Sequence, residues 1–247
     1  LNLPATLPLW KAAVGCIFAI AVVKQLFGGL GCNFANPAIT GRVFLLLSFA
    51  GDMTTWVKPF YYHGLSIGNQ LSSSAGSLDL DAVTSATPLV TGTASLSNLF
   101  LGNVGGCIGE TSALALLLGG LFLIFTRVIS PSTPIAYLGS LGILTFFHAL
   151  ATGGSLTEVP YALLSGGVMI GAFFMATDYV TTPITTKGKW IFGIGCGILT
   201  FVIREFASMP EGCSFSILLM NLLTPYIDKF TMTKPLGAKP IKKKEEA

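Results

Sequence analysis

The strongest constraint on the fold of this chain is a series of long apolar stretches, seven of which approach the roughly 20 residues that a membrane-spanning helix needs. They cover residues 7–27, 40–56, 111–128, 134–151, 159–177, 188–206 and 212–228. Apolar residues make up 52% of the 247 residues and charged residues only 10%, a composition that excludes an ordinary soluble domain. We therefore expect an all-α polytopic membrane protein in which residues 1–247 form a single membrane domain.

Glycine and proline interrupt several of these stretches. The chain contains 29 glycines and 13 prolines, and small residues in membrane helices let backbones approach closely or let a helix break around a buried site. Some stretches are also shorter than a full crossing. We therefore expect tilted or broken helices.

The basic residues give the chain an orientation. With the lysine-rich C-terminus placed in the cytoplasm, only Lys11, Lys58 and Arg204 of the 14 basic residues fall on the opposite side. Basic residues accumulate on the cytoplasmic side of membrane proteins, so we expect a cytoplasmic C-terminus and an outer loop at residues 57–110. The same count places Leu1 outside, and because the chain opens beside an apolar run without a signal peptide, we expect an odd number of earlier spans.

Neither the charge nor the cysteines indicate a nucleic-acid or metal site. The net charge of +3 arises in the tail between Lys234 and Glu246, so we expect no nucleic-acid partner. The five cysteines form no C-x-x-C pair, and His63 and His148 are isolated. This pattern lacks the spacing of an iron–sulfur or zinc site, and small buried membrane residues are the plainer interpretation of the cysteines.

Two pairs of segments are similar to each other within the chain. Asn-Pro-Ala-Ile-Thr at 36–40 is similar to Thr-Pro-Ile-Thr-Thr at 182–186, and the segment after Glu110 is similar to the segment after Glu211. Such pairs predict two similar halves with broken segments at matching positions around a central site. Two unrelated amphipathic stretches that share proline and glycine are the alternative.

The loop between the second and third stretches contains the polar sequence Asp81-Ala-Val-Thr-Ser-Ala-Thr87. A serine-rich run precedes it and Pro88 follows it, which is typical of a solvent-facing loop. We therefore expect the hydroxyl of Thr87, flanked by small residues such as Ser85, to be exposed to solvent. Taken alone, Ser-Ala-Thr is a weak pattern that an ordinary turn also contains.

Six landmarks follow one another along the chain. They are KQLFGGLGCNFANPA (Lys24 to Ala38), DMTTW (Asp52 to Trp56), the TSAT loop, CIGETSALALLLGG (Cys107 to Gly120), MATDYVTTP (Met175 to Pro183) and PEGCSFSILLMNLLTPYID (Pro210 to Asp228). Together they resemble the family that comprises the D-type component of Rnf ion-translocating ferredoxin:NAD+ oxidoreductases and the B-type component of Na+-translocating NADH:quinone reductases. The resemblance covers nearly the whole chain and implies a urea-transporter-like bundle of inverted repeats with broken helices.

The resemblance implies a covalent flavin. In this family the last threonine of D-x-x-T-S-A-T carries FMN through a phosphoester bond, which assigns the attachment to Thr87. Ser85 lies beside it, and Asp81 belongs to the same motif. The carboxylate of Asp81 would help to present the site, or a Mg2+ ion, to the flavin transferase that makes the bond.

A second, non-covalent flavin, riboflavin, is also implied by the resemblance. We expect one wall of its site in the glycine-rich segment between the first two stretches, because glycines let backbone N–H groups approach a planar ligand. The residues of this wall are Lys24, Gly28, Gly29, Asn33 and Asn36. A snorkelling lysine before a simple helix break is the alternative.

Carboxylates near membrane depth are candidates for an ion path, because burying a charge is costly and usually functional. We expect Asp178 at the cytoplasmic entrance, and Glu110 and Glu211 at the outer starts of their spans. Carboxylates at both ends could receive and release Na+ or H+. Pairing of Glu110 and Glu211 with helix N-terminal dipoles explains those two residues equally well.

These observations predict a membrane flavoprotein subunit of an Rnf-type complex in a bacterial or archaeal cell membrane, relaying electrons between flavins while Na+ or H+ is translocated. No G-x-G-x-x-G segment follows a strand, so we expect ferredoxin and NAD+ to bind other Rnf subunits, including a second flavin subunit and iron–sulfur subunits. The B-type component of a Na+-translocating NADH:quinone reductase is the nearest alternative. A urea-like channel is a further alternative that rests on fold alone. The choice between Na+ and H+ and the direction of electron flow stay open.

Overall fold

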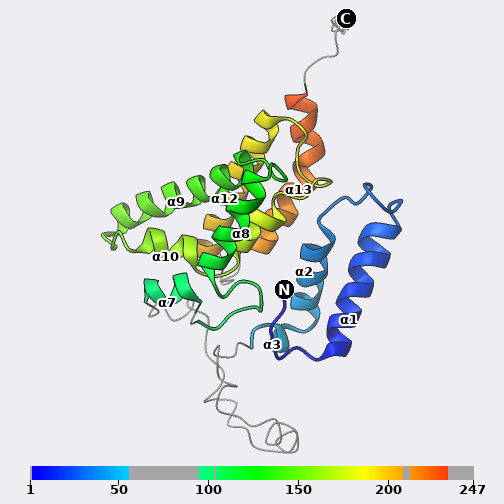
Figure 1. Cartoon of the computed structure of the whole chain (residues 1–247), viewed down its shortest axis with the longest axis horizontal. Coiled ribbons are helices and arrows are strands. Elements are labelled where there is room, and N and C mark those ends of the chain that lie inside the picture. Colours follow the sequence, from blue (N-terminus) through cyan, green and yellow to red (C-terminus); the bar gives the residue numbers. More distant parts are fainter. Residues whose placement is uncertain (1, 56–94, 103, 208–211, 233–247) are drawn as a thin grey trace, which may run out of the picture.

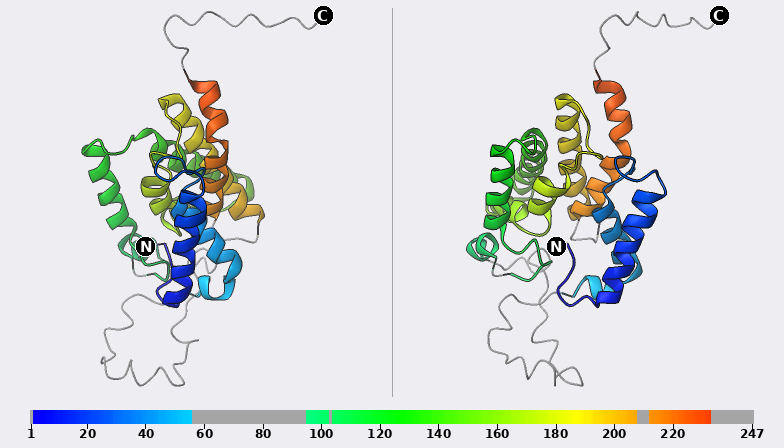
Figure 2. Two further views of the ribbon diagram at one scale, coloured as in Figure 1. Left: turned by 90° about the vertical axis from the view of Figure 1, so that its right-hand side faces the viewer. Right: turned by 45° about the vertical axis from the view of Figure 1, so that its right-hand side comes forward.

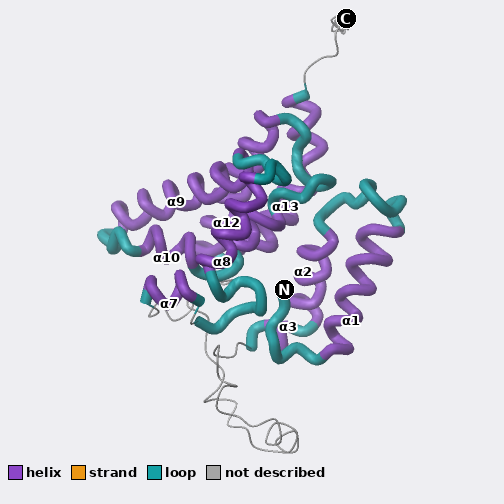
Figure 3. The backbone as a smooth tube through the Cα atoms, viewed as in Figure 1, coloured by secondary structure: helices purple, strands orange, loops and turns teal. Residues whose placement is uncertain are grey.

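The computed structural model describes residues 2–55, 95–102, 104–207 and 212–232, and these residues form helices and connecting turns without strands (Figure 3). The helical elements are α1 (Leu9–Ile17), the π-helical segment η1 (Phe18–Gln25), α2 (Pro37–Ser48), α3 (Ala50–Met53), α7 (Leu96–Leu101), α8 (Ala113–Phe125), α9 (Ser132–Thr152), α10 (Glu158–Leu164), α11 (Val168–Ile170), the π-helical segment η4 (Gly171–Met175), α12 (Thr186–Phe206) and α13 (Gly212–Thr231). The predicted all-α class is confirmed for these residues.

Each of the seven apolar stretches contains one helix or a run of consecutive helical elements. In the described part of the chain, α9 and α12, at 21 residues each, are long and apolar enough to cross a membrane, and α10 with the α11–η4 segment forms a third candidate that is bent by 63°. Helices α2 and α8 have only 12 and 13 residues, fewer than a crossing needs. The number of seven spans therefore stays a prediction.

The surface of the molecule carries large apolar side chains on most of its helices, as expected for a protein that contacts lipid or other membrane subunits. Five of them are at least 80% exposed: Leu9, Leu30, Phe125, Phe206 and Phe230. Together with the apolar helices, this surface agrees with an integral membrane protein.

Helices α9 and α12 pack closely because α12 presents glycines to α9. A Cβ atom added to Gly193 would lie 2.6 Å from Ala136 Cβ and 2.8 Å from Thr133 O. A Cβ atom added to Gly197 would lie 2.8 Å from Tyr137 O. Gly193 and Gly197 have the small-x-x-x-small spacing that lets the backbones of membrane helices approach.

Helix α13 connects the two parts of the bundle. It packs against α12 on one side and α2 on the other, and the main core around it includes the buried Ile39, Tyr137 and Ile217. The α1–η1–α2 hairpin stands on one side of α13, and α8, α9 and α10 lie on the other (Figures 1 and 2).

Among the described residues, three non-helical interruptions separate helical elements that pack around the core. Residues 26–36 separate η1 from α2, residues 165–167 separate α10 from α11, and residues 176–185 separate η4 from α12. The first and third lie toward the end of the bundle where α13 finishes, whereas α3 and α7 lie toward the opposite end (Figure 1). The expected broken helices are thus present.

We predict that Gly193→Val destabilises the protein by about 1–3 kcal/mol, the usual cost of overpacking, because the new atoms meet the backbone of α9 at Thr133. Gly139→Val is the control, since nothing lies within 4 Å of an added Cβ atom there. Thermal unfolding in detergent should show a lower midpoint for the Gly193 variant than for the control. Equal midpoints would contradict the close α9–α12 contact.

Candidate functional site

Four residues predicted from the sequence lie outside the described residues: Asp81, Ser85, Thr87 and Glu211. Their roles therefore stay predictions. The described chain stops at Thr55, after α3, and resumes at Ser95, before α7. α3 is held to α1 at this end by an ion pair between Lys11 Nζ and Asp52 Oδ2.

The glycine-rich interruption at residues 26–36 follows the predicted flavin residue Lys24. Lys24 is half-buried in the last turn of η1, and its carbonyl accepts a hydrogen bond from Gly29 N (3.0 Å). Gly28 and Gly29 have φ angles of 114° and 87°, which residues with a Cβ atom rarely adopt. The rings of Phe27 and Phe34, both partly exposed, lie 4.7 Å apart between centroids. The loop thus presents glycine backbone and aromatic rings.

Asn33 and Asn36, the other two predicted flavin residues, differ in their contacts. Asn33 Nδ2 donates to a carbonyl within the loop (3.1 Å). Asn36 is the N-cap of α2: its Oδ1 accepts from Ala38 N (3.0 Å) and Ile39 N (3.3 Å), and its Nδ2 donates to Met175 O (3.4 Å). The buried Asn36 amide therefore joins the start of α2 to the end of η4.

Asn36 also belongs to a polar cluster around a predicted ion-path residue, which we call the Asp178 cluster. Its members are Asn36, Asp178, Thr181, Asn221 and Thr224. With its amide oriented to satisfy both neighbours, Asn221 accepts from Asn36 N (3.1 Å) and donates to Thr181 O (3.2 Å). Thr181 O also accepts from Thr224 Oγ1 (2.9 Å), and Thr181 Oγ1 donates to Asp178 Oδ2 (2.9 Å). Asp178 is half-buried and the other members are buried, so the carboxylate lies at the edge of a buried amide and hydroxyl cluster.

A second polar cluster, the Glu110 cluster, contains Arg42, Cys107, Glu110 and Ser214. The buried Arg42 donates from Nη1 to Ser214 Oγ (2.7 Å) and from Nη2 to Cys107 Sγ (3.3 Å). Cys107 N in turn donates to Glu110 Oε1 (3.0 Å). Glu110 is only 7% exposed, and its Oε2 is buried near Gly167 without a hydrogen-bond partner among the described residues. A buried carboxylate oxygen without a donor is costly, so Glu110 has the capacity to accept a proton or a cation.

The two clusters lie at different levels of the same pair of helices. Arg42 is six residues after Asn36, and Asn221 is seven residues after Ser214. At 1.5 Å of rise per residue, the clusters are about 9–10 Å apart along the helix axes. Because Asn36 meets Asn221 and Arg42 meets Ser214, α2 and α13 run antiparallel.

An apolar layer separates the two clusters. Ile39 of α2 and Ile217 of α13 lie between the two levels, and both are fully buried in the main core with Val43. No group of three or more His, Cys, Asp or Glu side chains suited to a metal ion occurs among the residues that the structure describes. The arrangement therefore consists of two single carboxylates, each with polar neighbours, on either side of an apolar barrier.

Arg42, which the count of basic residues placed on the cytoplasmic side, is buried in the bundle. Helix α2 begins at Pro37 rather than at residue 40, so Arg42 lies in its second turn, inside the bundle. Sequence reasoning also missed Asn221 on α13. In both cases the available signal was a polar side chain inside an apolar stretch, which membrane proteins retain mainly for function.

Comparisons with known proteins agree on one family. The profile of the NQR2, RnfD, RnfE family matches residues 1–237. The chain is 47% identical to the D-type component of the Na(+)-translocating ferredoxin:NAD(+) oxidoreductase complex of Acetobacterium woodii, over 100% of this chain and 72% of the relative. It is 42% identical to the D-type component of the proton-translocating ferredoxin:NAD(+) oxidoreductase complex of Clostridium ljungdahlii (96% and 71% covered). It is 40% identical to the D-type component of the ion-translocating oxidoreductase complex of Stutzerimonas stutzeri (96% and 73%).

We predict that Asn36→Ala lowers the free energy of unfolding by about 1–2 kcal/mol, because it removes the N-cap of α2. Asn36→Ser restores a capping oxygen and should recover most of this loss. Asn33→Ala removes one bond in a partly exposed loop and serves as the control. Unfolding of the purified chain in detergent measures all three variants, and an Asn33→Ala effect as large as that of Asn36→Ala would contradict the capping role.

Proposed function

Because this chain belongs to the NQR2, RnfD, RnfE family, we propose that it is the D-type membrane component of an ion-translocating ferredoxin:NAD+ oxidoreductase complex. Relatives named as D-type components, at 40–47% identity, support this assignment over the B-type one. The chain supplies a membrane segment of the electron and ion paths, and other Rnf subunits, among them a second flavin subunit and iron–sulfur subunits, handle ferredoxin and NAD+.

The electron path in this proposal uses two flavins. A flavin transferase attaches FMN to Thr87 through a phosphoester bond, with Asp81 and Ser85 in the same motif; the D-x-x-T-S-A-T sequence carries this assignment. Riboflavin binds at the glycine-rich loop. Its residues are Lys24, Gly28, Gly29, Asn33 and Asn36.

The two flavins belong to opposite sides of the membrane in this proposal, with FMN outside and the C-terminus in the cytoplasm. Helices α3 and α7, which precede and follow the segment of Thr87 in the sequence, lie toward one end of the bundle, and the glycine-rich loop lies toward the other end (Figure 1). This separation supports an electron transfer that crosses the membrane. The flavins perform the redox chemistry, and the protein sets their positions and potentials.

The ion path runs along α2 and α13, from the Glu110 cluster to the Asp178 cluster, with Glu211 at the outer end. The buried, unpartnered Oε2 of Glu110 is the observation that supports it. Arg42 is linked to this carboxylate through Cys107, whose Sγ accepts from Arg42 Nη2 and whose N–H donates to Glu110 Oε1. The layer of Ile39 and Ile217 closes the route to passive flow, so transfer needs a conformational change, and an open urea-like channel is disfavoured.

The transported ion is Na+ or H+, and the relatives' names do not choose between them. One relative is named for Na+ and another for protons at similar identity to this chain. Carboxylates accept both ions. The choice therefore depends on measured cation dependence.

The inverted-repeat, urea-transporter-like architecture with seven spans rests on the sequence resemblance, because the two matching breaks that the structure describes lie toward the same end of the bundle, whereas inversion would place them at opposite ends. η1 and η4 are π-helical segments, and each is followed by an interruption and then by a capped helix. Asn36 caps α2, and Thr185 caps α12 by accepting from Gly188 N (3.0 Å). π-helical segments are often found at functional sites, which fits a pair of broken elements around a shared path.

We predict that Thr87→Ala abolishes covalent flavin while Thr84→Ala retains it, because only the last threonine of the motif carries the phosphoester. The chain should be produced with an active flavin transferase, denatured, separated by electrophoresis and examined for flavin fluorescence. A native chain that shows no fluorescence under these conditions would refute the attachment.

We predict that Glu110→Gln and Asp178→Asn each raise the cation concentration for half-maximal turnover of the assembled complex by at least about tenfold, equivalent to ~1.4 kcal/mol. Each change removes a charge and nearly preserves shape, so covalent flavin should remain. Glu158→Gln, in an exposed first turn of α10, is the matched control. Unchanged cation dependence in both variants would move the ion path to other residues or partner subunits.

A further inference from the structure

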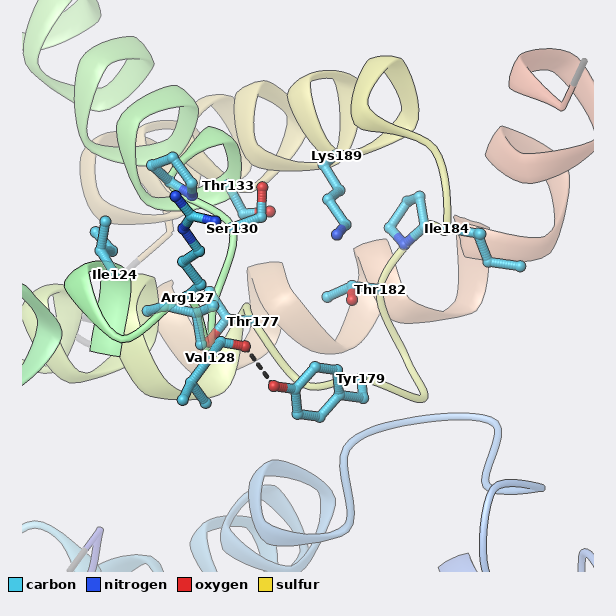
Figure 4. A pocket seen from close by; sticks show the side chains of 13 residues that line it. Ile124, Arg127, Val128, Ser130, Thr133, Thr177, Tyr179, Thr182, Ile184 and Lys189 are labelled. Carbon is cyan, nitrogen blue, oxygen red and sulfur yellow. Dashed lines mark hydrogen bonds between the residues drawn. The ribbon is translucent and has the colours of Figure 1, made fainter. Parts of the chain in front are cut away.

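A cavity of about 680 Å3 lies between the end of α8, the start of α9 and the start of α12. Figure 4 shows the side chains around it. No member of the Glu110 or Asp178 cluster lines it, so it is distinct from the ion path. The lining residues that matter for its chemistry are Arg127, Ser130, Thr133, Tyr179, Thr182 and Lys189.

Two cations line this cavity and no acidic side chain does. Arg127 comes from the α8–α9 connection and Lys189 from the first turn of α12. The nearby carboxylates are engaged elsewhere: Asp178 accepts from Thr181 Oγ1 (2.9 Å), and Asp228 accepts from a backbone N–H (3.0 Å). In the described part of the chain, neither cation has an ion pair with an acidic residue. The cavity is therefore positively charged.

Hydrogen-bond donors and helix ends add to this preference for an anion. The hydroxyl-bearing residues Ser130 and Thr133 line the cavity, whereas the hydroxyl of Thr182, which also lines it, donates to Asp178 O. Thr133 lies in the first turn of α9 and Lys189 in the first turn of α12. The partial positive charge at the N-terminus of a helix favours anions, phosphate in particular. Two helices thus contribute to the same positive region.

The backbone around Arg127 is held in an uncommon conformation. Arg127 has a φ angle of 58°, in the left-handed region that costs energy for a residue with a side chain. Val128 O accepts a hydrogen bond from Tyr179 OH, which ties the α8–α9 connection to the interruption before α12 (Figure 4). This hydrogen bond joins the α8–α9 connection to the segment before α12, and both line the cavity.

We propose that this cavity binds the phosphate headgroup of an anionic phospholipid. Large, exposed side chains occur beside the cavity: Phe125, Tyr179 and Ile184 are 87%, 76% and 72% exposed. The acyl chains of a bound lipid would cover them. Basic pockets between membrane helices on the cytoplasmic side recognise anionic lipid headgroups, and the predicted topology assigns Arg127 and Lys189 to that side. The proposal does not depend on the flavin or ion roles.

The test is native mass spectrometry of the assembled complex, stripped of lipid and titrated with phosphatidylglycerol or phosphatidylcholine in detergent micelles. We expect the complex to prefer phosphatidylglycerol. Arg127→Gln and Lys189→Gln should each weaken its binding about fivefold, as expected for one basic residue near a lipid surface. Lys189→Arg, which keeps the charge, should retain binding.

Lys187→Gln is the matched control, because Lys187 is an exposed cation two residues away that does not line the cavity. Phosphatidylglycerol binding that is unchanged in an Arg127→Gln/Lys189→Gln double variant, or that is weakened equally by Lys187→Gln, would overturn the proposal. A preference for a soluble phosphate ligand would also overturn the proposal. In that case inorganic phosphate or FMN would bind the stripped complex and would be weakened by Arg127→Gln and Lys189→Gln but not by Lys187→Gln. Phosphatidylglycerol would then bind no better than phosphatidylcholine. Unfolding midpoints of the variants in phosphatidylcholine identify any variant that fails to fold. If a Gln variant fails to fold, the phosphatidylglycerol binding of Lys189→Arg is the deciding measurement, and a loss of that binding would contradict the proposal.

Discussion

Every interruption of a helix exposes backbone groups that a membrane interior cannot satisfy, and in this protein side chains of α12 and α13 satisfy many of them. Arg204 of α12 donates to two carbonyls at the end of α10 (2.7 and 3.1 Å). Asn221 and Thr224 of α13 donate to the carbonyl of Thr181. Asp228, one turn later, accepts from a backbone N–H of the same interruption (3.0 Å). Helices α12 and α13 therefore stabilise the broken helices beside them.

The same bonds connect regions that the proposed function must couple. Asn36 closes the glycine-rich loop, its backbone N–H meets Asn221, and Asn221 meets Thr181, whose hydroxyl donates to Asp178. A movement of the loop on flavin reduction would therefore reach the Asp178 carboxylate through three hydrogen bonds.

The sequence allowed the helices to be located, because apolar stretches and breaks are local features. Side-chain partners were a different matter. Arg42 comes only two residues after the expected start of its span at residue 40, whereas the Asn36 cap and Pro37 begin the helix earlier, and Arg42 is buried in the bundle. The sequence around Asn221 does not indicate its hydrogen-bond partners, Thr181 and Asn36, because they lie 40 and 185 residues away in the sequence. The cavity between α8, α9 and α12 was not foreseen for the same reason, since its two cations lie 62 positions apart.

Arg42, which is buried, and Arg204, which is half-buried, also bear on the predicted orientation, because it rests on counting basic residues. Arg42 supported the cytoplasmic side and Arg204 the outer side, but Arg42 is bound to Ser214 and Cys107 inside the bundle, and Arg204 is bound to the backbone of α10. A side chain held by protein groups does not report on membrane charge asymmetry in the way a loop residue does. Removing one from each side leaves ten basic residues against two, Lys11 and Lys58, of the original 14. The excess of eight on the cytoplasmic side is unchanged, so the cytoplasmic C-terminus stays a prediction that rests on loop and tail residues.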